Sequence, residues 1–211
     1  MRSKKGLLGY YNYTVILTYI GMLVAFFGIA LVLEGEYCKA VLCLMVAGAC
    51  DMFDGAVAST RPRMPKERRF GVQIDSLCDL ICFGVLPALM VYILNGRSWA
   101  ALVVCSLYVL CALIRLAYFN VLEEERQDKT RERRSCYLGL PVTTIALLLP
   151  ALFGLDRIRF IPVQVSSLVL LCVAGAVYLL PVRIKKPHWI GRVIMLVVGA
   201  FEVCFLMIGA T

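Results

Sequence analysis

The chain has 211 residues, of which 61% are hydrophobic and 17% are charged, and its mean hydropathy is +0.84. A soluble domain has about 45–50% apolar and about 25% charged residues, so this composition excludes an ordinary soluble enzyme. The net charge of +8 would suit nucleic acid binding, but the Lys and Arg residues cluster between apolar segments. We therefore attribute the charge to the positive-inside rule and to attraction by anionic membrane lipid, and we expect no nucleic acid partner.

Seven apolar segments follow one another along the chain, separated by charged connections. Each is close to the roughly 20 residues that a helix needs to cross about 30 Å of hydrocarbon. The sequence thus predicts an all-α integral membrane protein, in which the first segment is a retained span because no small-residue cleavage site follows it. The short connections predict tight turns between antiparallel helices. The segments cover about 13–33, 37–58, 71–94, 98–121, 137–154, 161–181 and 189–209.

The distribution of Lys and Arg predicts the orientation of these helices. With the connections assigned alternately to the two sides, seventeen of the 22 Lys and Arg residues fall on the side of the N-terminus. Four fall on the other side, and Arg115 lies within a span. Because loops rich in Lys and Arg stay in the cytoplasm, we expect the N-terminus there and the C-terminus outside.

Four aspartates lie where the second and third apolar segments approach the same side of the membrane. Asp51 and Asp54 are three residues apart near the end of the second segment, and Asp75 and Asp79 are four apart near the start of the third. Both spacings place the two side chains on one face of a helix. Since the two helices run antiparallel, we expect the four carboxylates to face one another at the cytoplasmic edge.

Carboxylates in such a position need a compensating charge. Each costs at least about 2–3 kcal/mol at this depth, and their mutual repulsion adds to that cost. Hard divalent cations prefer oxygen ligands, two of them balance four negative charges, and ions so held also bind phosphate oxygens. Gly55, directly after Asp54, leaves room for a ligand to approach the backbone. The alternative is that two of these aspartates are helix-end residues paired with the arginines of the 61–69 loop, and that Gly55 is a packing glycine.

These residues resemble the signature of the CDP-alcohol phosphotransferase family, D-x-x-D-G-x-x-A-R followed after a short gap by G-x-x-x-D-x-x-x-D. Seven of the eight fixed positions are present, and the exception is the arginine, which is Ser59 here. The gap is a few residues longer than usual, and Arg61 or a neighbour in this basic loop is the candidate for the missing cation. The matching positions are Asp51, Asp54, Gly55, Ala58, Gly71, Asp75 and Asp79.

Within this family the chain is most similar to the phosphatidylserine synthases. Residues 75–88, 115–120 and 139–141 look like the extended motifs of that branch, although many relatives have a second arginine where this chain has Tyr118. On this resemblance, Arg115 and Asn120 bind the substrate, and Arg115 meets a phosphate or the serine carboxylate. Judged from the residues alone, Arg115 could instead snorkel or pair with an aspartate, and Asn120 could be a helix end.

The resemblance covers about residues 10–155 and also implies a fold. Family structures are helical, with a six-helix core and a lipid-accessible cavity that opens to the cytoplasm. The implied architecture is a single transmembrane catalytic domain over residues 1–211, in which about one extra C-terminal spanning helix follows the core and the additional spans lie at about 161–209. It further implies a multi-pass protein of the plasma membrane with a cytoplasmic active site, assembled as a homodimer.

The implied reaction transfers a phosphatidyl group from CDP-diacylglycerol to the hydroxyl of L-serine and gives phosphatidylserine and CMP. The four aspartates would hold two divalent cations, Mg²⁺ or Mn²⁺, on which the donor's diphosphate binds. Asp79 would also take the hydroxyl proton, because a serine hydroxyl is a weak nucleophile near neutral pH and a positioned base helps it. The remaining residues expected to bind the substrate are Gly55, Ala58 and Gly71.

Two other functions compete with this interpretation. The first is a sister enzyme with another acceptor, such as glycerol 3-phosphate or inositol phosphate, or with an archaeal lipid core on its donor. The second is a divalent-cation transporter that uses the four aspartates as its binding site. A transporter predicts polar residues continuing across the membrane, whereas residues 41–49 and 83–94 are apolar. A dead-end site of this kind suits an enzyme better than a pathway.

Overall fold

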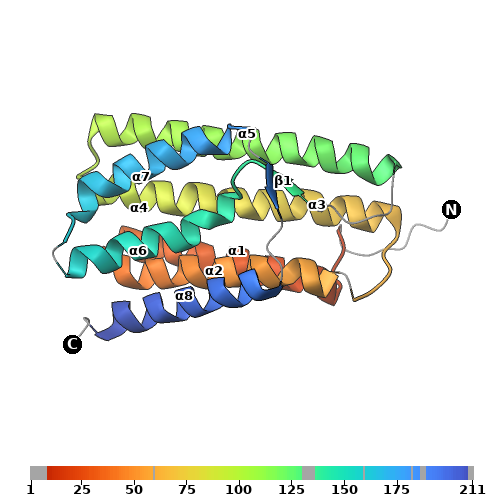
Figure 1. Ribbon diagram of the computed structural model, residues 1–211, viewed down its shortest axis with the longest axis horizontal. Coiled ribbons are helices and arrows are strands. Elements are labelled where there is room, and N and C mark those ends of the chain that lie inside the picture. Colours follow the sequence, from red (N-terminus) through yellow and green to blue (C-terminus); the bar gives the residue numbers. More distant parts are fainter. Residues whose placement is uncertain are drawn as a thin grey trace.

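The computed structural model of the protein describes residues 9–58, 60–129, 136–158, 160–181, 183–185 and 189–208. These residues form a bundle of helices that run back and forth along one axis, with a two-stranded antiparallel ribbon beside it (Figure 1). The elements in chain order are α1 (Tyr13–Leu33), α2 (Tyr37–Ala58), α3 (Pro65–Asp79), the π-helical turn η1 (Leu80–Val85), α4 (Leu86–Leu94), α5 (Trp99–Lys129), β1 (Cys136–Leu138), the 3₁₀ turn η2 (Val142–Thr144), α6 (Ile145–Arg157), α7 (Val163–Tyr178), β2 (Arg183–Lys185) and α8 (Trp189–Ile208).

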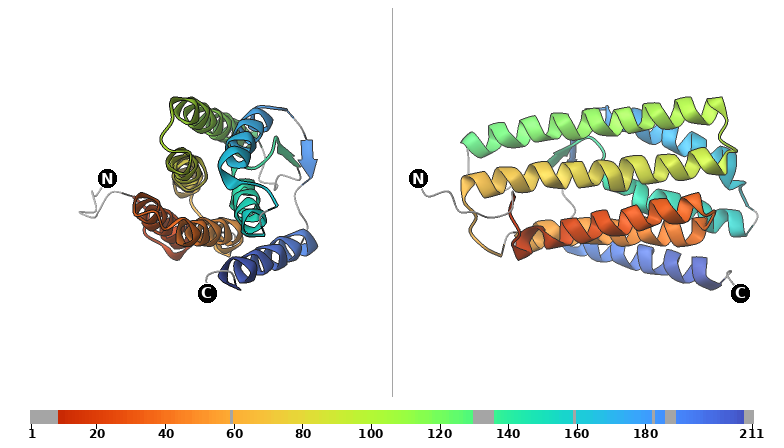
Figure 2. Two further views of the ribbon diagram at one scale, coloured as in Figure 1. Left: turned by 90° about the vertical axis from the view of Figure 1, so that its left-hand side faces the viewer. Right: turned by 180° about the vertical axis from the view of Figure 1, so that it is seen from behind.

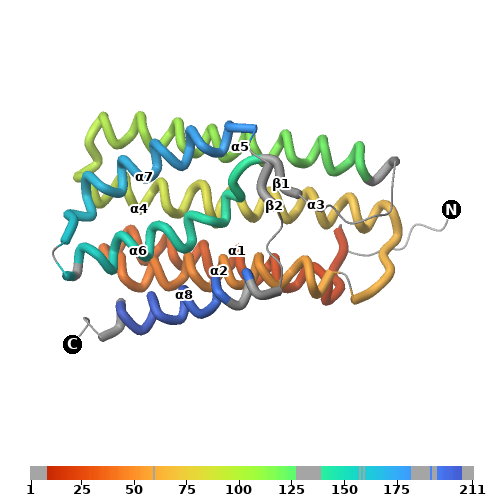
Figure 3. The backbone as a smooth tube through the Cα atoms, viewed as in Figure 1, coloured from red at the N-terminus to blue at the C-terminus, as the bar shows by residue number. Residues whose placement is uncertain are grey.

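The helices confirm the all-α membrane class and a multi-pass protein. Among the described residues, four helices are long and apolar enough to cross a membrane: α1, α2, the continuous rod α3–η1–α4, and α5 up to Arg126. Three shorter apolar helical stretches follow: η2 with α6, then α7, then part of α8. Figure 3 shows α3, η1 and α4 following one another in a single direction. With this rod counted as one helix, α1 to α7 make the six-helix core, and α8 is the extra C-terminal helix.

Three boundaries differ from the apolar segments of the sequence. α3 starts earlier, at Pro65, and α5 continues to Lys129. Both extensions are polar, so hydropathy does not register them, although a proline at the first helical position favours a helix start. The span predicted at 137–154 is wrong at its start. The strand β1 occupies that position, and Gly139 then adopts a left-handed conformation (φ +78°) before helical structure begins at Val142.

The ends of the helices alternate between the two ends of the bundle. The start of α1, the α2–α3 connection and the end of α5 lie at one end, whereas the α1–α2, α4–α5 and α6–α7 turns lie at the other (Figures 1 and 2). This is the antiparallel arrangement that the short connections predict. The short strands β1 and β2 pair antiparallel, and α8 packs against α6 and α2 at the edge of the bundle.

Small residues let α2 approach the helices on either side of it. A Cβ added to Gly21 of α1 would lie 3.2 Å from the Cβ of Cys50 on α2. A Cβ added to Gly48 of α2 would lie 2.8 Å from the Cβ of Ala146 on α6. In a membrane, helices associate through close packing of this kind, because lipid tails remove most of the hydrophobic driving force. The packing fixes α2, and with it the end of α2 that carries two aspartates.

A hydrogen bond from α5 completes the irregular turn in the middle of the α3–η1–α4 rod. The N–H of Leu86 bonds to the carbonyl of Ile81, five residues back rather than four. Pro87 has no N–H, so it cannot donate to the carbonyl of Phe83 four residues before it. The Tyr108 hydroxyl donates to this carbonyl instead, at 2.6 Å. The π-helical turn is thus supported from outside its own helix, as buried backbone oxygens require.

Tyr108→Phe is expected to lower the thermal unfolding midpoint of the protein in detergent, because the Phe83 carbonyl loses its donor inside the bundle. Leaving a buried hydrogen-bonding group without its partner costs about 1–3 kcal/mol. Tyr118, an exposed residue on the same helix, supplies the control, and Tyr118→Phe should leave the midpoint unchanged in the same scan. Equal midpoints for the two variants would contradict the role assigned to the Tyr108 hydroxyl.

Candidate active site

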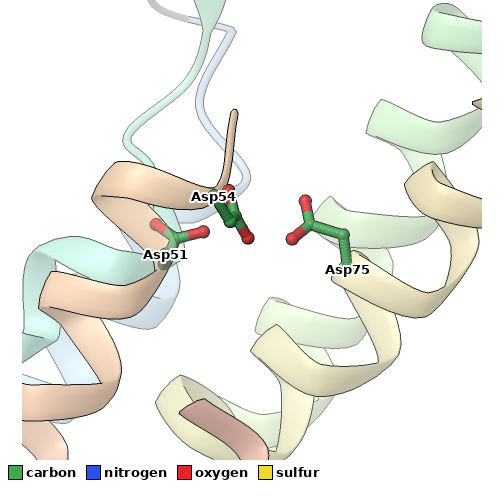
Figure 4. A group of neighbouring side chains, drawn as sticks. All are labelled: Asp51, Asp54 and Asp75. Carbon is green, nitrogen blue, oxygen red and sulfur yellow. The ribbon is translucent and has the colours of Figure 1, made fainter. Parts of the chain in front are cut away.

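Three aspartates from two neighbouring helices come together near the α2–α3 connection. Asp51 and Asp54 belong to the last two turns of α2, and Asp75 belongs to α3. Their carboxylates point toward one another across the space between the two helices (Figure 4), and one oxygen of each lies within 4.8 Å of the other two. The helical spacing that predicts a shared face on each segment thus brings carboxylates of both segments together.

Contacts within the bundle hold these side chains. Asp54 is the deepest of the three, with 8% of its surface exposed, while Asp51 and Asp75 are half-buried. The Thr18 hydroxyl of α1 donates a hydrogen bond to Asp54 Oδ2 at 3.1 Å. Within the described part of the chain, none of the aspartates forms an ion pair with Lys or Arg. Direct pairing with the arginines of the 61–69 loop, the alternative explanation for these aspartates, is therefore not observed.

Asp79 lies one helical turn beyond Asp75 and outside the group of three. It borders a small pocket together with Asp51 and Asp54, and the cavity volume of about 10 Å³ is roughly what one water molecule requires. Three carboxylates therefore meet at short range, and the fourth lies beside them. The other residues that line the pocket are Thr18, Gly21, Ala47, Cys50, Cys78, Cys82 and Phe83.

The chemistry of this donor set fits a hard divalent cation. Carboxylate oxygens are the ligands that Mg²⁺ and Mn²⁺ prefer. A Mg²⁺–oxygen distance of about 2.0–2.1 Å allows two ligands of one ion to lie up to about 4 Å apart, close to the separation of at most 4.8 Å seen here. The C-terminal end of α2 adds the partial negative charge of its helix dipole, which also favours a cation.

Three further positions of the signature border the aspartates. Gly55 faces open space, because a Cβ added there would meet no atom within 4 Å. Ala58 is the half-buried last residue of α2. Gly71 lies on α3, where an added Cβ would come within 2.9 Å of Nη1 of Arg63. Ser59, at which the family signature has arginine, lies outside the described residues.

Arg115 supports the turn at residues 139–141, which the sequence matches to the family as a separate motif. Only 8% of Arg115 is exposed, and its guanidinium donates to the carbonyls of Leu140 and, at 3.1 Å, of Gly139. Gly139 has a φ of +78°, and an added Cβ would lie 3.2 Å from the carbonyl oxygen of Leu180. The turn after β1 therefore depends on a glycine and on the charge-assisted hydrogen bonds of Arg115. A contact between Arg115 and a substrate stays a prediction.

Asn120 joins α5 to α3 beside the aspartates. Ser76 Oγ donates to Asn120 Oδ1 at 2.7 Å, and Asn120 Nδ2 donates to Gln73 Oε1 at 3.2 Å. Gln73 Nε2 donates in turn to Glu124 Oε1 at 3.0 Å. Because Ser76 directly follows Asp75, this network sets the rotation of α3 about its own axis. The structure therefore gives Asn120 a positioning role, and its predicted contact with a substrate is untested.

Sequence reasoning missed two residues that hold the site in place. Thr18 gives no signal, since it lies in an otherwise apolar helix. Glu67 is only 4% exposed and accepts hydrogen bonds from the side chain of Asn12 and, at 3.4 Å, from the backbone N–H of Met64. An acidic residue three positions after a helix start, whose side chain returns to the backbone, is half of a capping box. The segment Met64-Pro65-Lys66-Glu67 therefore contained a readable signal for the start of α3.

A family model described as CDP-alcohol phosphatidyltransferase matches residues 11–198. The chain belongs to this family. CDP-alcohol phosphatidyltransferases are membrane-embedded and in general depend on divalent cations. The group of aspartates in Figure 4 lies within the matched residues, as does Asp79.

Curated relatives of the chain are named CDP-diacylglycerol–serine O-phosphatidyltransferase. The protein from Saccharomyces cerevisiae is 37% identical over 108 residues, which cover 50% of this chain and 38% of the relative. The protein from Mycobacterium bovis is 30% identical over 161 residues, covering 71% of this chain and 53% of the relative. The protein from Helicobacter pylori is 27% identical over 198 residues, which cover 89% of this chain and 77% of the relative. The chain thus spans about half or less of the first two relatives and most of the third.

Asn120→Ala is expected to destabilise the protein by about 1–3 kcal/mol, because the polar groups of Ser76 and Gln73 lose their partner between two helices. Ser76→Ala should cost less. The double variant should unfold close to Asn120→Ala alone, since both substitutions remove the same bond. Thermal unfolding of the four proteins in detergent measures this coupling, and fully additive losses would show that the bond does not contribute.

Proposed function

We propose that the protein transfers a phosphatidyl group from CDP-diacylglycerol to the hydroxyl of L-serine, which gives phosphatidylserine and CMP. The observation that carries the proposal is the group of three carboxylates between α2 and α3, in a chain of the CDP-alcohol phosphatidyltransferase family. The shared name of the relatives supports serine as the acceptor and CDP-diacylglycerol as the donor. On this proposal the protein is a transferase of phospholipid biosynthesis.

Asp51, Asp54, Asp75 and Asp79 are the proposed metal ligands, for two divalent cations that are Mg²⁺ or Mn²⁺. Such ions, when bound, neutralise the diphosphate of the donor and stabilise the charge that develops on CMP. The residues of the chain keep this charge centre at the edge of the bundle, where a lipid headgroup and a water-soluble acceptor can both reach it. Thr18 restricts the rotation of the Asp54 carboxylate by its hydrogen bond, which keeps one ligand in place beforehand.

Asp79 is the proposed general base. The serine oxygen forms a bond to the phosphorus that carries diacylglycerol, and the bond from this phosphorus to the bridging oxygen breaks. The hydroxyl proton passes to the Asp79 carboxylate, and CMP leaves with the bridging oxygen. A positioned base contributes about 10²–10⁴-fold to such a step. The place of Asp79 in the pocket wall beside Asp51 and Asp54 supports this role.

Gly55, Ala58 and Gly71 border the proposed nucleotide site. The open space in front of Gly55 supports this assignment, since a ligand can approach the backbone there. Arg115 and Asn120 serve the same site by holding the turn after β1 and the rotation of α3. Direct contacts of these two side chains with serine or phosphate remain part of the proposal.

The proposed setting is the plasma membrane, with the N-terminus and the active site on the cytoplasmic side. The start of α1 and the basic α2–α3 connection lie at the same end of the bundle as the aspartates (Figures 1 and 4), which supports this orientation under the positive-inside rule. We further propose that residues 1–211 act as one transmembrane catalytic unit, with the motif-bearing core at about residues 10–155 and additional spans at about 161–209, and that the enzyme is a homodimer in the lipid bilayer.

The nearest alternative is a sister enzyme that uses glycerol 3-phosphate or inositol phosphate, or a donor with an archaeal lipid core. The carboxylate group would serve all of these substrates, so only an assay of acceptors and donors separates them. A divalent-cation transporter is a remote alternative. It needs a polar route past the aspartates, but the helices on their inner side are packed with the fully buried side chains of Leu44, Leu86 and Met90.

Release of CMP from CDP-diacylglycerol is the direct test. The purified protein with Mn²⁺ or Mg²⁺ should release CMP when serine is present, and removal of the metal by a chelator should abolish the release. Asp79→Asn should lower kcat by about 10²-fold or more through loss of the base. It should still unfold at a similar temperature, because it keeps the size of the side chain.

Two further assays, each with a matched comparison, test the acceptor and the metal site separately. Glycerol 3-phosphate and inositol phosphate, offered in place of serine, should release little CMP, and a preference for either would replace the serine assignment. Direct Mn²⁺ binding, followed by electron paramagnetic resonance, should weaken in Asp75→Asn and persist in Asp156→Asn, which lies at the opposite end of the bundle. Equal Mn²⁺ binding by both variants would remove the aspartate group as the metal site.

Gly55→Ala should have opposite effects on stability and on donor binding. Alanine in a helix interior is favoured over glycine by about 0.5–1 kcal/mol, and no atom lies within 4 Å of the new methyl group. The same methyl group would occupy the proposed nucleotide space and raise the KM for CDP-diacylglycerol several-fold. Gly199→Ala on α8, where the added Cβ makes only ordinary contacts of 3.8 Å and 3.9 Å, is the control. It should gain similar stability with no change in KM, and equal KM values for both variants would exclude Gly55 from the site.

A further inference from the structure

Arg63 lies in the connection between α2 and α3, beside the aspartates. Arg63 and Arg68 are half-buried, whereas Arg61, Lys66 and Arg69 are exposed. A basic side chain in a loop normally extends into water, and basic residues are buried only where they are paired or required. Partial burial therefore separates Arg63 and Arg68 from the other basic residues of this segment, and of these two only Arg63 lies in the connection, before α3 begins at Pro65.

The guanidinium of Arg63 faces charges of both signs. Burial lowers its pKa, Glu67 raises it, Arg68 lowers it again, and Asp54 and Asp75 raise it. A guanidinium stays protonated at any physiological pH, so Arg63 adds a permanent positive charge next to the carboxylates. No hydrogen bond or ion pair joins it to another residue in the part of the chain that the structure describes. Its N–H groups are thus available to a ligand.

Gly71 provides the space in which the guanidinium lies. A Cβ at this position would come within 2.9 Å of Nη1 of Arg63, closer than a real Cβ approaches another atom, so a larger residue would displace the arginine. Glu67, one turn earlier on α3, is buried and hydrogen-bonded to Asn12, and its charge attracts Arg63. The start of α3 is therefore built to keep Arg63 near Asp75.

We propose that Arg63 binds a phosphate of the CDP-linked donor, in place of the arginine that the family signature has at the position of Ser59. This inference rests on the proposed function and adds a binding residue to its site. The fork of N–H donors on a guanidinium matches the oxygens of a phosphate group. The α2–α3 connection is longer here than in the signature, and its extra length lets an arginine further along the chain return to the aspartates.

Binding of CDP to the purified protein with Mn²⁺, measured by isothermal titration calorimetry in detergent, tests this role. Arg63→Gln should weaken the affinity about 10- to 100-fold, the usual effect of losing a charge-assisted hydrogen bond to a ligand. Lys66→Gln removes the same charge from an exposed neighbouring position and should change the affinity less than about threefold. A loss of affinity in Arg61→Gln but not in Arg63→Gln, or in neither, would overturn the proposal.

Two combined variants separate a lost contact from a damaged fold. Ser59→Arg, added to Arg63→Gln, should recover most of the affinity, because it restores a guanidinium at the signature position. Gly71→Ala should weaken CDP binding in the wild-type chain but add little in the Arg63→Gln chain, since it acts through the displaced arginine. Absence of recovery with Ser59→Arg, or an equal effect of Gly71→Ala in both chains, would contradict the inference.

The same measurements keep this inference apart from the proposed function. A wild-type protein that binds CDP but releases no CMP with serine would overturn the serine assignment and leave Arg63 as a phosphate ligand. Serine-dependent CMP release together with an unchanged CDP affinity in Arg63→Gln would overturn only the role of Arg63. A wild-type protein that binds no CDP in the presence of Mn²⁺ would overturn both.

Discussion

The concentration of carboxylates at one edge of the bundle is the constraint on which the rest of the structure depends. Asp51 and Asp54 occupy the end of α2 that carries the partial negative charge of the helix dipole, and Asp75 adds a third carboxylate across from them. Such a group persists in a membrane only where packing fixes it and positive charge can reach it. Close contacts of α2 with α1 and α6 provide the packing, and Arg63 provides permanent positive charge from within the chain.

The α3–η1 helix, which carries Asp75 and Asp79, is hydrogen-bonded to α5 both before and after these two residues. Before them and between them, Gln73 and Ser76 are bonded to Asn120 of α5. After them, the π-helical turn receives the Tyr108 hydroxyl, also from α5. The extra residue in a π-helical turn changes the rotation of the side chains on either side of it, and such turns are frequent at functional sites. α5 thus carries no residue of the carboxylate group and still decides where Asp75 and Asp79 point.

The features that depend on local spacing could be predicted from the sequence. Segment lengths predicted the spans except for the start of the fifth, and the intervals within the aspartate pairs predicted their shared faces. The sequence was insufficient for contacts between residues far apart in the chain, such as Arg115 with Gly139 or Tyr108 with Phe83, because periodicity carries no information on which helices are neighbours. The choice between Arg61 and Arg63 was open for a related reason, since it depends on the path of a connection. The polar first turn of α3 was not predicted, because hydropathy measures transfer into lipid, whereas capping groups stabilise a helix start in water.

The closed inner side of the site has a kinetic consequence. Phe83 lines the pocket together with the aspartates, and, among the described residues, Leu44, Leu86 and Met90 are fully buried in the apolar core of the bundle. In the proposed reaction, the water-soluble acceptor would arrive, and the nucleotide product would depart, at the end of the bundle that carries the α2–α3 connection. Where substrate and product share one route, a product that stays bound blocks binding of the next substrate. If the proposed function holds, accumulated CMP slows each new cycle, and the rate of lipid synthesis depends on how fast CMP is removed.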